Sequence, residues 1–247
     1  MNLLIDIGNS RIKWASSAGM TLSDHAAFEY KKESMTDLLK KHWHASASPD
    51  AVYISNVAGA DVAKIVSAVI RQKWQTKLLF VKAQRQCCGV VNAYKEASQL
   101  GVDRWLAIIA AWNKYRAPVC VIDCGTALTI DAVSAGGQHL GGLIIPGLRM
   151  MQDMLSRETH GIQVDRNNQS SLGFGRCTTE CITNGASCAI VSLVERMAGQ
   201  LESEQGSKLC RIITGGYAAY INDLIMPAFD LEPHLVFNGL MLIADGQ

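Results

Sequence analysis

One short pattern occurs twice in this chain, and its two copies lie almost half a chain apart. The first copy is "LLIDIGNSRIKWA" at residues 3–15, and the second is "VIDCGTALTIDAV" at residues 121–133. Each copy reads as an apolar strand, an Asp-x-Gly turn and a second strand, which predicts a β-hairpin. A gapless overlay with one offset of 117 residues gives four matched pairs: Asp6 with Asp123, Gly8 with Gly125, Asn9 with Thr126, and Ile12 with Thr129.

This repeat predicts two lobes of related fold. A single Asp-x-Gly turn is what any hairpin prefers, and on its own it would indicate only a turn. Two copies in 247 residues predict that each lobe offers a loop with exposed backbone N–H groups and a carboxylate. Such loops suit a phosphate chain with its Mg²⁺, because glycine lets the backbone approach closely and carboxylates hold the water shell of the metal.

The segments between the copies alternate between strands and helices. Residues 51–58 alternate like a strand that ends in a polar Ser-Asn tip, residues 61–74 have helical spacing, and residues 77–83 form another strand. This order predicts an α/β fold with buried central strands. Because no low-complexity linker separates the lobes, we place the boundary before the second hairpin, with an N-terminal lobe at 1–116 and a C-terminal lobe at 117–247.

The commoner nucleotide-binding loops are missing from the sequence. There is no GxxxxGK[ST] loop and no GxGxxG after a strand, and "GFGRCT" at 173–178 lacks the last glycine. These absences exclude the Walker-type and Rossmann-type readings.

Composition limits the partners and the location of the protein. A net charge of +1 with 18% charged residues gives no reason to expect a nucleic acid or an anionic membrane as partner. The longest apolar run, at 106–112, is far shorter than the roughly 20 residues of a membrane-spanning helix. Asp6 interrupts the first apolar run too early for a signal peptide, so we expect a cytoplasmic protein.

The cysteines show neither disulfide nor zinc spacing. Eight are present, and the pairs at 120/124 and 177/181 are spaced CxxxC. Zinc sites use CxxC pairs or spaced histidines, so we expect reduced, mostly buried cysteines.

Asp103 begins an apolar helical pattern, and its position allows two interpretations. Trp105, Ile108, Ile109 and Trp112 form one helical face, so Asp103 could be an ordinary N-cap followed by a solvated Arg104. The same position would hold a carboxylate rigidly and keep it ionised, which suits a base that accepts a proton from a substrate hydroxyl.

Three glycine-rich or capping segments follow in the second half. Five glycines and one proline between Gly136 and Gly147 argue against a regular element, and Pro146 with Gly147 indicates a turn into a helix. Thr178 and Thr179 with Glu180 suit a helix start. Gly215 and Gly216 form either a βα turn or a place where a flat base lies against the backbone.

Taken together, these residues resemble the type III pantothenate kinases, bacterial enzymes of the acetate kinase, sugar kinase, Hsp70 and actin superfamily. The resemblance implies two similar ribonuclease H-like lobes, the actin-like ATPase fold, with the active site in the cleft between them. Ser10 replaces the threonine that is commoner in the family and keeps the hydroxyl. Eight segments carry the resemblance in order: "DIGNSRIKW", "NAY", "GVDRW", "DCGTALT", "GGLIIPG", "TTECITNG", "TGG" and "NGL".

The resemblance implies roles for the residues of the nucleotide site. Asp6 would lie near Mg²⁺, and Asp123 would help hold a monovalent cation, K⁺ or NH₄⁺. Gly125 and Thr126 would form the second phosphate loop, while Gly215 and Gly216 would form the adenosine motif. The ATP-binding loop would consist of Asp6, Ile7, Gly8, Asn9, Ser10, Arg11, Ile12 and Lys13.

The resemblance also implies a pantothenate site and a homodimer. Asp103 would be the catalytic base, and Arg104 could pair with the substrate carboxylate. Thr178, which lies seven residues before Gly185, would complete the site from the neighbouring subunit, with a dimer helix in the C-terminal lobe. The substrate-binding residues would be Tyr94, Gly101, Val102, Asp103, Arg104 and Thr178.

The implied activity is ATP-dependent phosphorylation of pantothenate to 4′-phosphopantothenate, the first step of coenzyme A biosynthesis. One alternative is another small-molecule kinase of the same superfamily, which acts on a sugar or acetate. A second is a non-catalytic, nucleotide-binding regulatory accessory protein. The three acids Asp6, Asp103 and Asp123 favour an enzyme over the accessory protein.

Overall fold

The computed structural model describes residues 1–30, 34–43, 47–159, 171–206 and 208–246 of the chain. The chain folds into two compact units. Unit 1 contains Met1–Ala110 and His234–Gln247, and unit 2 contains Ala111–Pro233.

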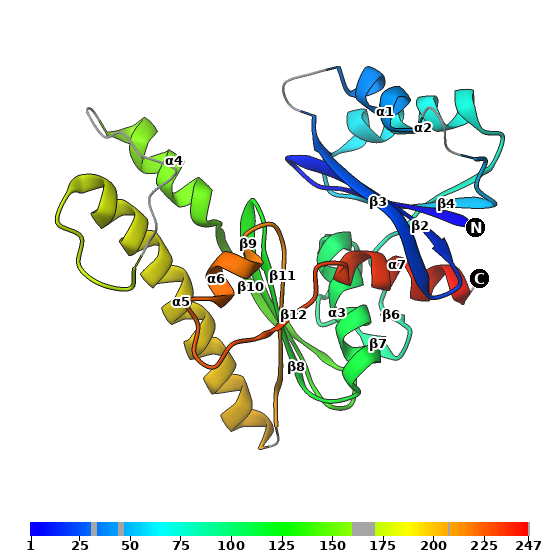
Figure 1. Cartoon of the computed structure of the whole chain (residues 1–247). Coiled ribbons are helices and arrows are strands. Elements are labelled where there is room, and N and C mark those ends of the chain that lie inside the picture. The colour runs from blue at the N-terminus through cyan, green and yellow to red at the C-terminus, as the bar shows by residue number, and fades with distance from the viewer. Residues whose placement is uncertain (31–33, 44–46, 160–170, 207, 247) are drawn as a thin grey trace. The chain divides into compact units, whose positions relative to one another are not determined.

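Unit 1 is built on a five-stranded sheet with the order β3-β2-β1-β4-β5. The first three strands are antiparallel, while β4 and β5 continue the sheet in parallel. Helices α1 and α2 cover one face and α7 covers the other (Figure 1). The bounds are β1 Asn2–Ile7, β2 Arg11–Ala18, β3 Thr21–Glu29, α1 Met35–Trp43, β4 Ala51–Asn56, α2 Ala60–Lys73, β5 Lys77–Phe80 and α7 Leu235–Asp245.

Alternation along β1 decides which way Asp6 points. Leu3, Ile5 and Ile7 pack in the core with α1 and α2. Leu4 packs in the other core, with α7 and helix α3 (Val102–Tyr115). Because successive strand side chains point to opposite faces, Asp6 shares the face of Leu4 and points to the side where α3 begins.

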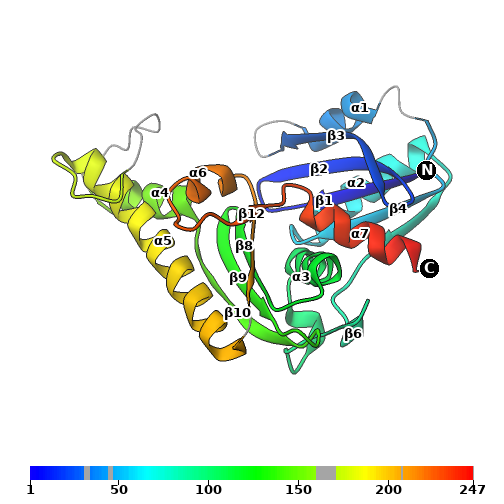
Figure 2. The same ribbon diagram turned by 60° about the horizontal axis from the view of Figure 1, so that its bottom comes forward.

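Unit 2 repeats the same sheet order, β10-β9-β8-β11-β12, again with three antiparallel strands and two parallel ones. Helix α5 runs along one face of this sheet (Figure 2). The buried side chains of α5 share a hydrophobic core with Ile122 and Ile213. The bounds are β8 Val119–Cys124, β9 Ala127–Val133, β10 His139–Pro146, α4 Leu148–Glu158, α5 Thr178–Gln205, β11 Cys210–Thr214, α6 Ala218–Asn222 and β12 Asp230–Leu231.

The matching sheet orders confirm the predicted α/β fold of two similar lobes. The gapless overlay of the two hairpins holds for Asp6 with Asp123 and is wrong after the turn, where it paired Ile12 with Thr129. In the first hairpin Asp6 pairs across the strands with Lys13. In the second, Asp123 pairs with Thr129. The second turn is therefore one residue shorter, so Thr129 corresponds to Lys13 and not to Ile12.

The C-terminal segment departs from the expected division of the chain. The predicted lobes were 1–116 and 117–247, whereas the boundary falls inside α3, and α7 belongs to unit 1. Gly239 explains this packing, since a Cβ atom there would lie 2.8 Å from the carbonyl carbon of Leu106. Helix α7 thus lies directly on the backbone of α3.

Two local expectations also differ from the structure. The glycine-rich segment forms strand β10, with a register shift between His139 and Gly141, although the predicted turn into a helix at Gly147 is present. All eight cysteines are free, as expected, but only Cys120 and Cys124 are buried. Among the described helices, none has the length and apolar character needed to cross a membrane.

Candidate active site

The first hairpin holds the buried acid Asp6 against two partners. The Ser55 hydroxyl, on the neighbouring parallel strand β4, donates a hydrogen bond of 3.1 Å to Asp6 Oδ1. Lys13 Nζ lies 3.9 Å from Asp6 Oδ2. Burial raises the pKa of Asp6 above its ordinary value of 3.8; the charge of Asp103 also raises this pKa, while Lys13 and Ser55 lower it. The net direction is upward, so burial and the second acid outweigh the two partners.

Two hydrogen bonds to the backbone of Gly8 fix the turn of this hairpin. The Gly8 N–H donates to the Arg11 carbonyl at 3.0 Å, and the Tyr30 hydroxyl donates to the Gly8 carbonyl at 2.8 Å. Asn9 is exposed at the tip and Ser10 is partly exposed. The turn therefore presents Asn9 and the neighbouring backbone to solvent.

Three other residues of the predicted phosphate loop point elsewhere. The side chains of Ile7 and Ile12 are fully buried in the core, so only their backbone groups could face a ligand. Arg11 pairs with Glu29 on β3, with Nη2 at 3.0 Å from Oε1, and both side chains are about half exposed. Lys13 is the basic residue of this loop that lies beside Asp6.

Asp103 lies in the first turn of α3 and is held by its own helix. The helix begins at Val102, and the Arg104 N–H donates to Asp103 Oδ1 at 2.8 Å. A Cβ atom on Gly101 would lie 2.7 Å from the same oxygen, so a side chain at position 101 would displace the carboxylate. Asp103 is not the ordinary N-cap of the simpler interpretation, since it lies one residue inside the helix.

Arg104 is buried rather than solvated, and it contacts Tyr94. Its Nη1 donates to the Tyr94 hydroxyl at 3.1 Å, and its guanidinium carbon lies 5.9 Å from the centroid of the same ring. The structure thus brings five predicted residues together in unit 1, and they are Asp6, Lys13, Tyr94, Asp103 and Arg104.

In unit 2, the second hairpin is closely packed by two glycines. The Gly147 N–H donates to the Thr126 carbonyl at 3.1 Å, and a Cβ atom there would lie 2.6 Å from that oxygen. Gly215 has a φ of +100° and its missing side chain leaves room for the Asp123 carboxylate. Both positions therefore need glycine for close approach. Close packing against Asp123 explains why position 215 is a glycine. The next residue, Gly216, is exposed.

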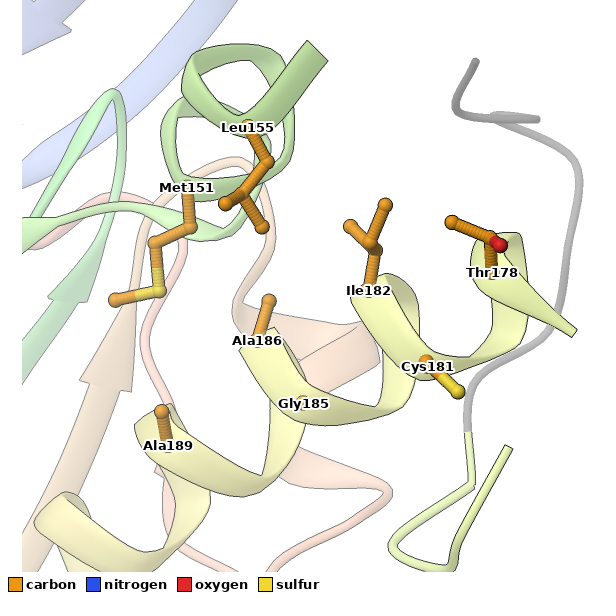
Figure 3. Close-up of a pocket in the computed structure, with 8 residues that line it drawn as sticks. All are labelled: Met151, Leu155, Thr178, Cys181, Ile182, Gly185, Ala186 and Ala189. Atoms are coloured by element: carbon orange, nitrogen blue, oxygen red, sulfur yellow. The ribbon is translucent and has the colours of Figure 1, made fainter. Parts of the chain in front are cut away.

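Thr178 is the first residue of α5 and is exposed. The expected helix start at Thr178 is present, but the N-cap is Cys177, which makes no side-chain capping hydrogen bond. Glu180 Oε2 instead accepts the N–H of Arg176, which precedes the N-cap, at 2.7 Å. Thr178 is one of the residues that line a largely apolar pocket between α4 and α5 (Figure 3). The pocket has a volume of about 370 Å³. Its lining also includes Met151, Leu155 and Ile182.

Two contacts in unit 1 were not foreseen from the sequence. Ser55 bonds Asp6 across 49 positions, and Tyr30 bonds Gly8 across 22. The polar tip of the strand at 51–58 was the available signal for Ser55, but only the pairing of β1 with β4 shows its partner. Nothing in the local sequence around Tyr30 indicates its contact.

The acids of unit 1 suit a magnesium–phosphate site. Mg²⁺ in such sites is usually held by one or two carboxylates together with phosphate oxygens and water. No cluster of three or more potential metal-ligating side chains occurs in the described parts of the chain, so an all-protein metal cage is not present there. A divalent cation beside Asp6 would favour the ionised carboxylate and so oppose the rise in pKa that burial and Asp103 cause.

The repeated sheet and the two Asp-x-Gly hairpins define the class first: this is the two-lobed fold of actin-like ATPases and sugar kinases. The chain belongs to the type III pantothenate kinase family, whose profile matches residues 2–200. A type III pantothenate kinase of Nitrosococcus oceani is 36% identical to it over 249 residues, covering 99% of this chain and 94% of the relative.

Solved structures agree on the fold. A conserved protein of Campylobacter jejuni, assigned to the Baf family of transcriptional activators, has a TM-score of 0.65 at 21% identity and covers 99% of this chain and 98% of its own. The activator of 2-hydroxyisocaproyl-CoA dehydratase from Clostridium difficile, with bound ADPNP, has a TM-score of 0.51 at 11% identity, with coverages of 99% and 94%. At these identities the likeness concerns the fold alone.

Proposed function

We propose that this chain transfers the γ-phosphoryl group of ATP to the primary hydroxyl of pantothenate, giving 4′-phosphopantothenate and ADP. The observation that carries the proposal is the pair of acids in unit 1, because the charge of Asp103 is close enough to raise the pKa of buried Asp6. One carboxylate is then available to a metal ion and the other to the substrate. Family membership supports this choice of substrate. We expect the reaction in the cytoplasm.

Asp103 has the role of general base. It accepts the hydroxyl proton of pantothenate while the oxygen attacks the γ-phosphorus in line and ADP leaves. The N-terminal end of α3 favours the ionised form of this carboxylate. Arg104, which donates to the Tyr94 hydroxyl, would pair with the substrate carboxylate.

The glycine turns have the role of binding ATP. The backbone around Gly8 and Asn9, together with Gly125 and Thr126, would approach the phosphates, and Gly216 the base. Asp6 would hold Mg²⁺, which supplies charge neutralisation when bound. Asp123 would hold K⁺ or NH₄⁺.

A second copy of the chain has a role in substrate binding. Thr178 is exposed at the start of α5, where a neighbouring subunit could reach it. We therefore propose a homodimer in which Thr178 of one subunit completes the pantothenate site of the other.

An ADP-release assay tests the activity. The purified chain is given Mg-ATP with pantothenate, sugars or acetate, with and without K⁺, and the product is identified by its mass. We expect turnover of pantothenate alone. Turnover of a sugar but not of pantothenate would favour the other kinases of the fold, and ATP binding without turnover of any acceptor would favour a regulatory protein.

A further inference from the structure

Tyr94 lies in a segment with little regular structure, so something other than secondary structure must hold it. Between β5 and α3, the chain forms only β6 (Gln86–Cys87), β7 (Val90–Val91) and a single 3₁₀ turn (Ala97–Gln99). The hairpin of β6 and β7 contains just two paired positions. Such a segment keeps one conformation only if side chains bind its backbone.

Asn92 is the centre of that binding. Its side chain is fully buried, and its Oδ1 accepts the Tyr94 N–H at 2.9 Å. Its Nδ2 donates to the carbonyls of Gln84 at 3.2 Å and Ala97 at 3.3 Å. One amide group thus joins both ends of the segment to Tyr94.

Arg85 completes the contacts from the surface. Its Nη1 donates to the Asn92 carbonyl at 3.2 Å and to the Tyr94 carbonyl at 3.1 Å. The Asn92 N–H donates in turn to the Arg85 carbonyl at 2.9 Å. Both backbone polar groups of Tyr94 are therefore held, the N–H by Asn92 and the carbonyl by Arg85.

The side chain of Tyr94 passes this constraint on. Its hydroxyl accepts the bond from Arg104, whose own backbone N–H binds Asp103. We infer that Asn92 and Arg85 are positioning residues of the phosphoryl transfer: they fix Tyr94, and through it the guanidinium of Arg104, for the acceptor substrate. This inference rests on the proposed function, because Arg104 is there the partner of the pantothenate carboxylate.

The main test is the kinetics of Asn92→Ala. Loss of bonds worth about 1–3 kcal/mol would raise KM for pantothenate roughly 5- to 150-fold. The KM for ATP should remain unchanged, because the ATP loops lie outside this network. An equal rise in both KM values would overturn the inference.

Asn222 provides a matched control. In unit 2 its Nδ2 donates to the Phe229 carbonyl at 2.9 Å, and its Oδ1 accepts the Phe229 N–H at 2.8 Å. Asn222→Ala thus removes a similar loop-closing amide away from Tyr94. We expect it to lower Tm and leave KM for pantothenate unchanged.

A double-mutant cycle separates positioning from general stability. If Asn92 acts through Tyr94, Asn92→Ala raises KM less in a Tyr94→Phe background than in the wild type. Additive effects would show that Asn92 acts by another route. Should Asn92→Ala not fold, Arg85→Gln changes an exposed side chain and takes its place in the same cycle.

Hydrogen exchange decides the positioning without any substrate. The Tyr94 amide should exchange faster in Asn92→Ala than in the wild type, while the Phe229 amide should not. An unchanged Tyr94 amide would overturn the inference. If the wild type fails to phosphorylate pantothenate, the proposed function falls, and the exchange result still decides whether Asn92 holds Tyr94.

Discussion

The two Asp-x-Gly hairpins share one sheet position but differ in what surrounds the acid. Asp6 is buried and faces the cationic Lys13 across the hairpin, whereas Asp123 is partly exposed and faces the neutral Thr129. The first turn is pinned by the Tyr30 hydroxyl, the second by Gly147. A one-residue difference in turn length thus gives one acid a protein cation and gives the other a hydroxyl. This suggests different cation needs in the two units.

The largest effect is expected for Asp103. The charge of this acid acts on Asp6 of the first hairpin, and our proposal gives the second hairpin no comparable acid. Asp103→Asn should fold but lose about 100-fold or more in kcat, the usual scale for a general base. Steady-state ADP release measures it.

The control for Asp103 is Asp61→Asn. Asp61 also lies in the first turn of a helix, α2, but it is exposed and pairs with Lys64 at 3.1 Å. Its variant should have wild-type kcat. Near-normal turnover by Asp103→Asn would remove this residue from the mechanism.

The next largest effect is expected when the residue opposite Asp123 is changed to the type that lies opposite Asp6. Thr129→Lys recreates the Asp6–Lys13 arrangement opposite Asp123, so the new ammonium should replace the K⁺ that we propose at Asp123. Activation by a bound effector is typically about 5- to 150-fold, and the variant should lose it. Measurements of ADP release and of Tm in KCl against NaCl give two readouts.

Two further variants serve as controls for Thr129→Lys. Asp123→Asn should also lose the K⁺ response. Its activity should stay low, however, because this variant has no ammonium group to replace the cation. Thr21→Lys, on the exposed start of β3, should keep the full response. A K⁺ response retained by Thr129→Lys would show that the residue opposite Asp123 does not set the cation requirement.

A smaller effect is expected from the glycine that packs on the second hairpin. Gly215→Ala places a Cβ atom 2.7 Å from the Cys124 nitrogen at a φ of +100°, so it should destabilise unit 2 by roughly 1–3 kcal/mol. Gly199→Ala, in the middle of α5 with open space around it, should instead stabilise by about 0.5–1 kcal/mol. Urea unfolding compares the two. Equal effects would show that Gly215 is not needed for close packing.

The sequence predicted those parts of the site that depend on local pattern. Asp-x-Gly turns, the start of α3 beside Asp103 and the start of α5 at Thr178 follow from residues within one or two turns of chain. The alternation of strands and helices likewise predicted the α/β class.

The remainder depends on contacts between distant residues. A gapless overlay cannot detect a turn shortened by one residue, so it missed that Thr129 replaces Lys13. The return of α7 to unit 1 depends on the fit of Gly239 against Leu106, and hydropathy alone does not show this. Cys177 and Cys181 were expected to be buried because cysteine usually is, but they lie at the exposed start of α5.

The smallest expected effect concerns the cost of burying Asp6. Since its folded pKa lies above 3.8, the folded state holds the proton to higher pH than the unfolded state. Stability is therefore lost as pH rises from 3.8 through the folded pKa, and the loss is constant above it. Asp6→Asn removes that cost, so at pH 7 it should gain on the order of 1 kcal/mol, or roughly 2–4 °C in Tm.

The pH profile of this gain separates burial from the other contacts of Asp6. The difference between Asp6→Asn and the wild type should shrink as pH falls towards 3.8, where the wild-type acid is protonated in the fold. Thermal melts of both proteins across that range measure it. A variant less stable than the wild type at pH 7 would mean that Lys13 and Ser55 outweigh burial. The first hairpin would then resemble a structural ion pair more than a site kept charged for a metal.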